Sequence, residues 1–311
     1  MPVDHGRTLV VASLRPVADR IVELVLAAAD GQRLPRWAPG AHVDLVLSTG
    51  LTRPYSLAGD PDDDRGWRLL VARSPTAGDG AGNHIHDVLR TGERLRVRGP
   101  RHLFSLGGGA RYLFLAAGAG IAPLLPMVRR VRAARVYPWS LVHVDGSSRY
   151  TALRAEVESL GATSRSSPER RAAVRALADA HPDTAVYVCG SGLFVDELAR
   201  AAPRGVDLHR QQFDAAGGGP GAGHAYEVVL ARQGERIRVE PGTRLLSALH
   251  QAGVEVPVSC GTGNCGACLV RVLGGAVEHH DRVLTDLERS GGRQIVSCVS
   301  TAAGEQLVLD L

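Results

Sequence analysis

The sequence predicts a multidomain chain that combines α+β and α/β folds. Three observations lead to this prediction. Short β-like runs separated by turns fill the chain up to about residue 104, which is typical of a closed antiparallel barrel. From residue 111 onward strands alternate with helices, which indicates a parallel sheet flanked by helices. A glycine-rich stretch, 214–224, then precedes a separate strand-rich segment.

The expected barrel rests on apolar runs that are too short for helices and are bounded by turn residues. The clearest runs are 8–11, 21–26, 42–47 and 67–72. They predict an antiparallel β-barrel domain.

The middle of the chain begins with a strand at 112–117, continues through a glycine turn, and enters a helix at 124–131. Further strands are expected at 140–144 and 185–188. This alternation predicts a Rossmann-like parallel-sheet domain.

The last segment opens with two strands joined by a turn at Gly234, and a helix with Leu245, Leu246 and Leu249 on one face follows. Its expected strands are 226–230, 235–239, 269–272 and 307–309. The composition shifts place the domain boundaries at 1–106, 107–214, a linker at 215–224, and 225–311.

Composition narrows the class of protein. At 311 residues, with 44% hydrophobic and 22% charged residues, the chain is expected to be globular and to hold more than one core. No apolar run approaches the roughly 18 residues of a membrane span. The N-terminal residues 1–7 lack the pattern of a secretory signal, so a cytoplasmic protein with reduced thiols is expected. The net charge of +4 is scattered, which favours a solvated surface over nucleic-acid binding.

Four cysteines in the last segment follow a C-x4-C-x2-C…C pattern: Cys260, Cys265, Cys268 and Cys298. This is the thiolate spacing of plant-type 2Fe–2S ferredoxins. Glycines between the first three cysteines let the backbone wrap around an inorganic core. A zinc knuckle or a disulfide pair is the alternative, although zinc sites usually pair C-x2-C with a second such motif or with histidines. The order of strands, helix and cysteine loop resembles the β-grasp of plant-type ferredoxins.

The run Arg53-Pro54-Tyr55-Ser56-Leu57 matches the R-x-Y-S-x flavin motif of the ferredoxin-reductase superfamily. An arginine binds phosphate as a forked donor. The tyrosine offers a ring to cover the flavin, and the serine offers a hydroxyl. The alternative is an ordinary strand end with an exposed arginine. The resemblance implies that Arg53, Tyr55, Ser56 and Leu57 bind flavin in the barrel domain.

The glycine-rich run 78–87 occupies the place of the family's phosphate loop at a helix start. The candidate cofactor-binding residues here are Gly80, Ala81, Gly82 and Asn83. The family often has R-G-G-S at this point, whereas this chain lacks the arginine and the serine. Asn83 is therefore expected to supply the polar contact, with Asp79 facing away. The alternative is a plain glycine turn capped by Asn83.

The run 117–123 resembles the G-G-x-G-I-[TA]-P turn of the same superfamily, in which Gly118 and Gly120 let a pyrophosphate approach the backbone. Ala117 and Ala122 depart from the pattern, and a hydroxyl contact is lost at the second position. The turn therefore predicts a pyridine-nucleotide site in the parallel-sheet domain.

Cys189-Gly190-Ser191-Gly192 follows a later strand and matches the family's C-G-[PS] motif at the nicotinamide end. The resemblance implies that Cys189 and Gly190 bind the nucleotide and that Cys189 lies beside the hydride path, without acting as a nucleophile. A buried structural cysteine is the alternative.

The coenzyme preference depends on the end of the strand 140–144. Asp145 would accept a hydrogen bond from a ribose hydroxyl and repel a 2′-phosphate, which favours NADH. Arg149 keeps NADPH open as the alternative.

The order of flavin barrel, nucleotide domain and C-terminal ferredoxin resembles the phthalate dioxygenase reductase family, which includes the vanillate demethylase reductases. The resemblance implies FMN, with FAD less favoured, and a catalytic path past Ser56 and Cys189. It further implies electron delivery to a terminal oxygenase, with a Rieske-type partner favoured over a haem-thiolate one. A monomer is expected. A non-catalytic redox sensor is the alternative from another functional class, and the nucleotide turn argues for turnover.

Overall fold

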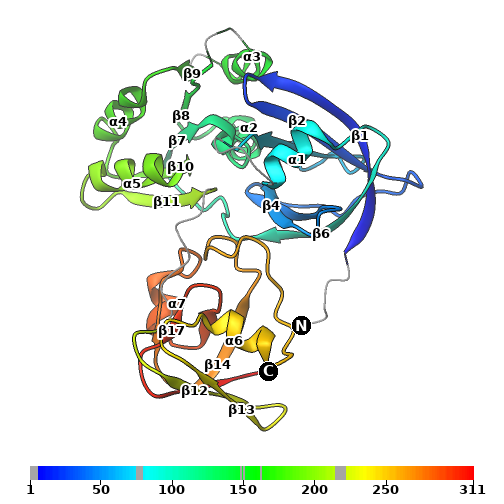
Figure 1. Cartoon of the computed structure of the whole chain (residues 1–311). Coiled ribbons are helices and arrows are strands. Elements are labelled where there is room, and N and C mark those ends of the chain that lie inside the picture. Colours follow the sequence, from blue (N-terminus) through cyan, green and yellow to red (C-terminus); the bar gives the residue numbers. More distant parts are fainter. Residues whose placement is uncertain (1–5, 75–79, 148, 150, 162, 214–221) are drawn as a thin grey trace. The chain divides into compact units, whose positions relative to one another are not determined.

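The structure, a computed structural model, describes residues 6–74, 80–147, 149, 151–161, 163–213 and 222–311. The chain divides into two compact units, Met1–Phe213 and Asp214–Leu311 (Figure 1). The first unit contains the barrel and the parallel sheet, and the second contains the four clustered cysteines. None of the helices in the described ranges has the length and hydrophobicity that a bilayer crossing requires.

Six strands form the barrel of the first unit: β1 (Arg7–Ala18), β2 (Ile21–Ala28), β3 (Ala41–Val46), β4 (Thr52–Ser56), β5 (Trp67–Ala72) and β6 (Arg94–His102). Their order is β4-β3-β6-β1-β2-β5, and every neighbouring pair is antiparallel. A bridge between Leu57 and Leu69 joins the end of β4 to β5, which brings the two edges together. Inward leucines, valines and Trp67 fill the interior. The predicted antiparallel barrel is confirmed.

Five parallel strands follow: β7 (Arg111–Ala117), β8 (Trp139–Val144), β9 (Ser164–Ser167), β10 (Thr184–Gly190) and β11 (Asp207–Gln212). Their order is β11-β10-β7-β8-β9. After β7 the chain adds β8 and β9 on one side of this strand, and it later adds β10 and β11 on the other side. The carboxyl ends of β7 and β10 therefore meet at the switch point where such sheets bind ligands.

Helices cover both faces of this sheet. The 3-10 turn η1 (Gly118–Ile121) leads into α2 (Leu124–Ala134), and α3 (Ala152–Ser159), α4 (Arg170–Ala178) and α5 (Gly192–Ala201) come later. Alternate residues of β7 belong to different apolar cores: Phe114 packs with α2 and α3, whereas Leu113 and Leu115 pack with α4 and α5. Burial on both faces explains why the strands read as continuous apolar runs.

The barrel and the parallel sheet share one of these cores. Val17, Ile21, Ala58 and Leu70 of the barrel half cluster with residues of α2, α3 and β7. A common apolar core holds the two halves of the first unit together.

The second unit has a five-stranded sheet in the order β13-β12-β18-β14-β16. The strands are β12 (Tyr226–Leu230), β13 (Glu235–Val239), β14 (Leu269–Gly274), β16 (Gln294–Val296) and β18 (Gln306–Leu309). The β12–β18 pair is parallel and the other pairs are antiparallel. α6 (Leu245–Gln251) packs on this sheet through Leu245, Leu246 and Leu249, which confirms the predicted β-grasp.

Short elements of this unit lie outside the sequence prediction: β16, α7 (Asp286–Ser290), and the pair β15 (Val277–Glu278) and β17 (Thr301–Ala302). Of the linker predicted at 215–224, residues 215–221 lie outside the described residues. Ala222 is buried in the core of the second unit, and Gly242 N donates a hydrogen bond to Ala222 O at 2.9 Å. The domain boundaries stay a prediction.

Candidate functional site

The flavin motif forms strand β4 and its exit. Arg53 is exposed, and its Nη1 donates to Thr52 O at 2.8 Å. Tyr55 packs against the barrel core, and burial raises the pKa of its hydroxyl. Leu57 is fully buried in that core, so its side chain fills the barrel and its backbone alone remains for a ligand. The motif thus presents a guanidinium, a ring and a hydroxyl on one short strand.

A histidine that the sequence analysis missed lies opposite Ser56. His42 and Ser56 are direct cross-strand partners in the β3–β4 pair and are 2% and 5% exposed. Neither ring nitrogen of His42 has a hydrogen-bond partner among the described residues. Burial, with a smaller contribution from the Arg101 charge, lowers the pKa of His42 to about 3, so the ring is neutral. The signal in the sequence is a polar residue inside the apolar run 41–47.

The candidate phosphate loop is only partly described, because Gly78 and Asp79 lie outside the described residues. Gly80 is the N-cap residue of α1 (Ala81–Asp87), and no side-chain hydrogen bond caps the helix at this position. Asn83 Oδ1 accepts a hydrogen bond from Ser74 N at 3.1 Å, and the alternative of a plain glycine turn capped by Asn83 stays a prediction as well. A phosphate role for Gly80, Ala81, Gly82 and Asn83 stays a prediction.

The two nucleotide motifs, about seventy residues apart in the sequence, are in direct contact. Gly120 lies so close to the end of β10 that a Cβ atom there would be 2.2 Å from Cys189 O. A Cβ atom on Gly190 would be 3.0 Å from the Ala117 side chain. Glycine is therefore required where these backbones cross. The structure brings Gly118, Gly120, Cys189 and Gly190 together at the switch point of the sheet.

Cys189 itself is fully buried in the core that the barrel and the sheet share. Burial raises the pKa of its thiol well above the usual value, so the group is a neutral thiol and no nucleophile. Its Sγ lies 4.0 Å from Gln211 Oε1. The backbone of Cys189 borders the nucleotide turn, whereas its side chain has the burial of a structural cysteine.

One polar side chain of β8 contacts the same turn, and a second follows directly after the strand. His143 is fully buried, and its Nε2–H donates to Gly118 O at 2.9 Å. This histidine, also missed by sequence reasoning, fixes the carbonyl of the glycine turn. Asp145 is 7% exposed, and its Oδ1 accepts a hydrogen bond from Ser147 N at 3.0 Å. Asp145 thus lies two residues beyond His143 at the carboxyl end of β8, where the sequence analysis expected a ribose contact.

The cysteine loop directs backbone N–H groups at sulfur, as the glycine-rich sequence predicts. Cys260 N donates to Cys265 Sγ, and Thr262 N donates to Cys260 Sγ, both at 3.4 Å. Gly263 has φ +76°, and a Cβ atom there would be 2.6 Å from Val299 Cγ2. The loop therefore packs closely against the residue that follows Cys298.

The four cysteines form two hydrogen-bonded pairs, Cys260 with Cys265 and Cys268 with Cys298. In the first pair, the hydrogen bond from Cys265 lowers the pKa of Cys260 to about 5. In the second, the hydrogen bond from Cys298 lowers the pKa of Cys268. The side chains of the four cysteines thus interact in two pairs within one loop region.

The structure bears on the disulfide and zinc alternatives for these cysteines. All five cysteines are free, so the disulfide alternative is wrong. Within the described ranges, no three His, Cys, Asp or Glu side chains are placed so that they could hold one metal ion together. Two thiol pairs fit a cluster of two irons held by four cysteines.

The fold and the site define an electron-transfer oxidoreductase with a nucleotide-binding sheet and an iron–sulfur domain. The profile of the family described as "2Fe-2S iron-sulfur cluster binding domain" matches residues 228–303. A vanillate O-demethylase oxidoreductase of Pseudomonas sp. strain HR199 is 34% identical over 97% of this chain and 99% of its own length. A phenoxybenzoate dioxygenase subunit beta of Ectopseudomonas oleovorans is 35% identical over 96% of this chain and 99% of its own.

Two solved structures agree with this assignment. Phthalate dioxygenase reductase, described as modular for electron transfer from pyridine nucleotides to [2Fe–2S], matches with a TM-score of 0.68 and 27% identity over 99% of this chain and 98% of its own. An intact type IV self-sufficient cytochrome P450 monooxygenase matches with a TM-score of 0.86 and 33% identity over 98% of this chain. The present chain spans 41% of that longer protein. The chain belongs to the phthalate dioxygenase reductase family, and it is an oxidoreductase of the oxygenase-reductase class.

Proposed function

We propose that the chain carries electrons from NADH through FMN and a 2Fe–2S cluster to a Rieske-type terminal oxygenase. The observation that carries the proposal is the contact between the Gly118–Gly120 turn and Cys189–Gly190 at the switch point of the sheet. The flavin motif lies in the same compact unit, and the paired cysteines lie in the second.

The bound groups would supply the redox chemistry: a hydride from NADH reaches the flavin, and its two electrons leave singly through the cluster. The residues of this chain bind and orient. Arg53 offers its guanidinium to the FMN phosphate, Tyr55 offers its ring, and Ser56 offers its hydroxyl to the flavin edge. The buried, neutral His42 keeps that edge free of an extra charge.

Around the nicotinamide nucleotide, Gly118 and Gly120 would admit the pyrophosphate, and Gly190 would admit the nicotinamide end. Asp145 would accept a ribose hydroxyl and disfavour the 2′-phosphate of NADPH. The residues that would hold the cluster are Cys260, Cys265, Cys268 and Cys298, and the cluster would supply one-electron transfer. Such a protein would act as a monomer in the cytoplasm, where thiols stay reduced.

A haem-thiolate monooxygenase is a second candidate for the electron acceptor. The specific observation in its favour is the TM-score of 0.86 to the self-sufficient P450, against 0.68 to phthalate dioxygenase reductase. The Rieske-type acceptor is preferred because the curated relatives named above belong to a demethylase and a dioxygenase and match over almost their entire length.

Turnover of the FMN- and cluster-loaded protein tests the proposal. We expect NADH to drive rapid reduction of cytochrome c, and NADPH to drive it more slowly, because Asp145 would repel a 2′-phosphate. Addition of a purified Rieske oxygenase or a purified P450 then identifies the class of acceptor. Failure to turn over with either coenzyme would favour a redox sensor, and faster turnover with NADPH would overturn the role of Asp145.

A further inference from the structure

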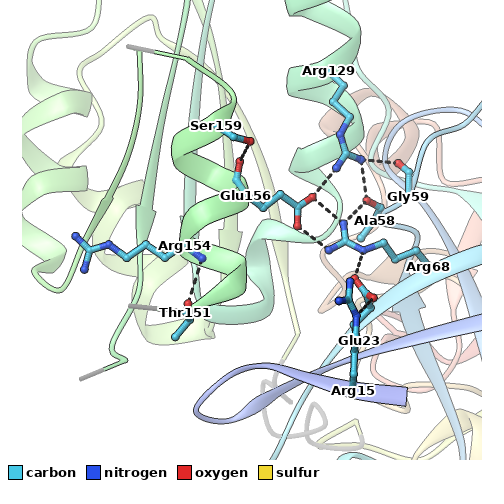
Figure 2. A network of polar contacts seen from close by, with 10 residues as sticks. All are labelled: Arg15, Glu23, Ala58, Gly59, Arg68, Arg129, Thr151, Arg154, Glu156 and Ser159. Atoms are coloured by element: carbon cyan, nitrogen blue, oxygen red, sulfur yellow. Dashed lines mark hydrogen bonds and ion pairs between the residues drawn. The ribbon is translucent and has the colours of Figure 1, made fainter. Parts of the chain in front are cut away.

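Five charged side chains form a continuous ion chain with alternating signs (Figure 2). The ion chain runs, in order, through Arg15, Glu23, Arg68, Glu156 and Arg129. Arg15 Nε and Arg68 Nε bind the two oxygens of Glu23 at 2.7 and 2.6 Å. Arg68 binds Glu156 with two parallel hydrogen bonds of 2.8 and 2.6 Å. Arg129 Nη2 adds a bond of 2.5 Å to Glu156 Oε1.

The ion chain crosses from the barrel to the parallel-sheet half of the first unit. Glu23 on β2 and Arg68 on β5 belong to the barrel, whereas Glu156 on α3 and Arg129 on α2 belong to the other half. Arg68 and Glu156 are 88 residues apart in the sequence. The forked contact between them therefore fixes the two halves in one relative position.

The same arginines hold the backbone that directly follows the flavin motif. Arg129 Nη1 donates to Ala58 O at 3.1 Å and to Gly59 O at 3.0 Å. Arg68 Nη1 lies 3.3 Å from Ala58 O and donates to it as well. Ala58 comes one residue after the motif ends, and α2 begins three residues after the Gly118–Ile121 turn ends. The ion chain thus links the two segments that would carry the two redox cofactors.

The inner members are shielded from water, so their pairing is specific. The side chains of Glu23, Arg68 and Glu156 are 6%, 18% and 23% exposed. Burial alone would lower the pKa of Arg68, but the hydrogen bonds to Glu156 and Glu23 and their charges raise it above its usual value. Each carboxylate is shared by two guanidinium groups, so loss of either carboxylate would leave two like charges facing each other.

Glu156 is held on a well-anchored helix. Thr151 Oγ1 accepts the Arg154 N–H at 3.1 Å and caps α3, and Ser159 Oγ donates to Glu156 O at 2.7 Å (Figure 2). Leu153 and Val157, on the same helix, belong to the core shared with the barrel. A side chain on such a firmly packed helix keeps its position and can therefore orient the groups that it binds.

We propose that the ion chain sets the register between the flavin strand β4 and the nucleotide turn, with Arg68 and Glu156 as positioning residues for hydride transfer. This inference rests on the proposed function. Hydride transfer needs the reacting atoms about 3–3.5 Å apart, and a misplacement of about 1 Å can cost up to about a hundredfold in rate. The apolar core holds the halves together, and the directional ion pairs select one relative position.

The test compares Glu156→Gln with the native FMN-loaded protein in anaerobic stopped-flow mixing with NADH. Glutamine keeps the shape of the side chain but cannot neutralise two guanidinium groups. We expect the rate of flavin bleaching at saturating NADH to fall at least about tenfold, with the Kd for NADH changed less than about twofold. The long-wavelength absorbance of stacked nicotinamide and flavin should weaken in parallel. In the protein without NADH, hydrogen exchange at Ala58 and Gly59 should become faster.

Glu158→Gln is the matched control, because Glu158 lies on the same helix and its ion pair, to Arg154 at 3.0 Å, stays within α3. It should leave the rate and the absorbance unchanged. If Glu156→Gln yields no folded protein, Arg68→Lys provides the same test, since it keeps the charge and loses the forked contact. An unchanged rate in the variant, or a loss of rate explained by weaker NADH binding, overturns the inference. Failure of the native protein to bleach with NADH would instead contradict the proposed function.

Discussion

At the scale of single residues, two polar side chains of the barrel, His42 and Ser56, are buried although such side chains are usually exposed. His42 faces Ser56 from the neighbouring strand and is only 2% exposed. A buried imidazole without a hydrogen-bond partner pays a desolvation penalty when it takes a proton, so it stays neutral in the folded chain. The flavin strand thus has a polar but uncharged neighbour.

The first prediction concerns acid sensitivity. The pKa of His42 is about 3 in the folded chain and about 6.5 in the unfolded chain. Between these two pH values the unfolded state therefore binds a proton at His42 that the folded state does not bind. The free energy of unfolding should therefore fall as pH drops from 6.5 toward 3, with a contribution of up to about 1.4 kcal/mol per pH unit from this group.

Urea unfolding between pH 4 and 7 measures this slope in the native chain and in His42→Phe. The variant should lose part of the acid dependence. His102→Phe, at an exposed position whose charge makes only the smallest contribution to the lowered pKa of His42, should keep most of it. Equal slopes in all three proteins would contradict a buried, neutral His42.

The sequence predicted a role for a single residue only where that residue belongs to a recognisable motif. The flavin motif named Arg53, Tyr55, Ser56 and Leu57 as candidates, but it could not show that the Leu57 side chain fills the barrel. The burial of His42 and His143 depends on which strands lie beside them, and strand order is a long-range property. Their neighbours were therefore visible only in the folded chain.

At the scale of elements, the nucleotide site is a crossing of two backbone turns. η1 passes over the end of β10 so closely that only glycine fits at Gly120. His143 on β8 holds the preceding carbonyl of Gly118. Three strands that are distant in the sequence therefore fix the turn at which we propose that the pyrophosphate binds.

The second prediction is that Gly120→Ala disrupts this turn. A methyl group would lie 2.2 Å from Cys189 O, and the backbone would have to move away. We expect binding of NADH to weaken at least about tenfold while the flavin content is kept, since β4 is untouched. Gly108→Ala, where no atom lies within 4 Å of the added carbon, is the control and should bind NADH normally. Native affinity in Gly120→Ala would refute the placement of the turn.

Hydrophobic periodicity predicted most regular elements because their local pattern and their burial agree. The strands 226–230 and 235–239 and the strand 67–72 have the expected bounds. β9, β15, β16, β17 and α7 were missed because elements of two to five residues carry too little periodicity to be recognised. The longer elements β6, β11, α3, α4 and α5 were not predicted either. The pairing of the cysteines and the hydrogen bond from Ser74 N to Asn83 Oδ1 depend on loop geometry that spacing does not encode.

At the scale of the whole molecule, the motifs for flavin and nucleotide lie in one unit and the cysteines for the iron–sulfur cluster lie in the other. The first unit contains the flavin motif and the nucleotide turn around one shared core, and the second contains the paired cysteines in a β-grasp. The order of the three sheets along the chain was predictable from composition and motifs. The ion chain was not, because Arg15, Glu23, Arg68, Arg129 and Glu156 look like ordinary surface charges in the sequence.

The most direct test of the central claim, that electrons pass from the nucleotide site to the flavin and only then to the cluster, is NADH mixing with Cys265→Ser. Flavin bleaching and cytochrome c reduction are followed in the native chain, in the variant, and in Ser290→Ala, a control at an exposed hydroxyl of the same unit. We predict that Cys265→Ser bleaches its flavin at the native rate and reduces cytochrome c only at background. Loss of flavin bleaching in the variant, or native cytochrome c reduction without an intact cluster, would contradict the account.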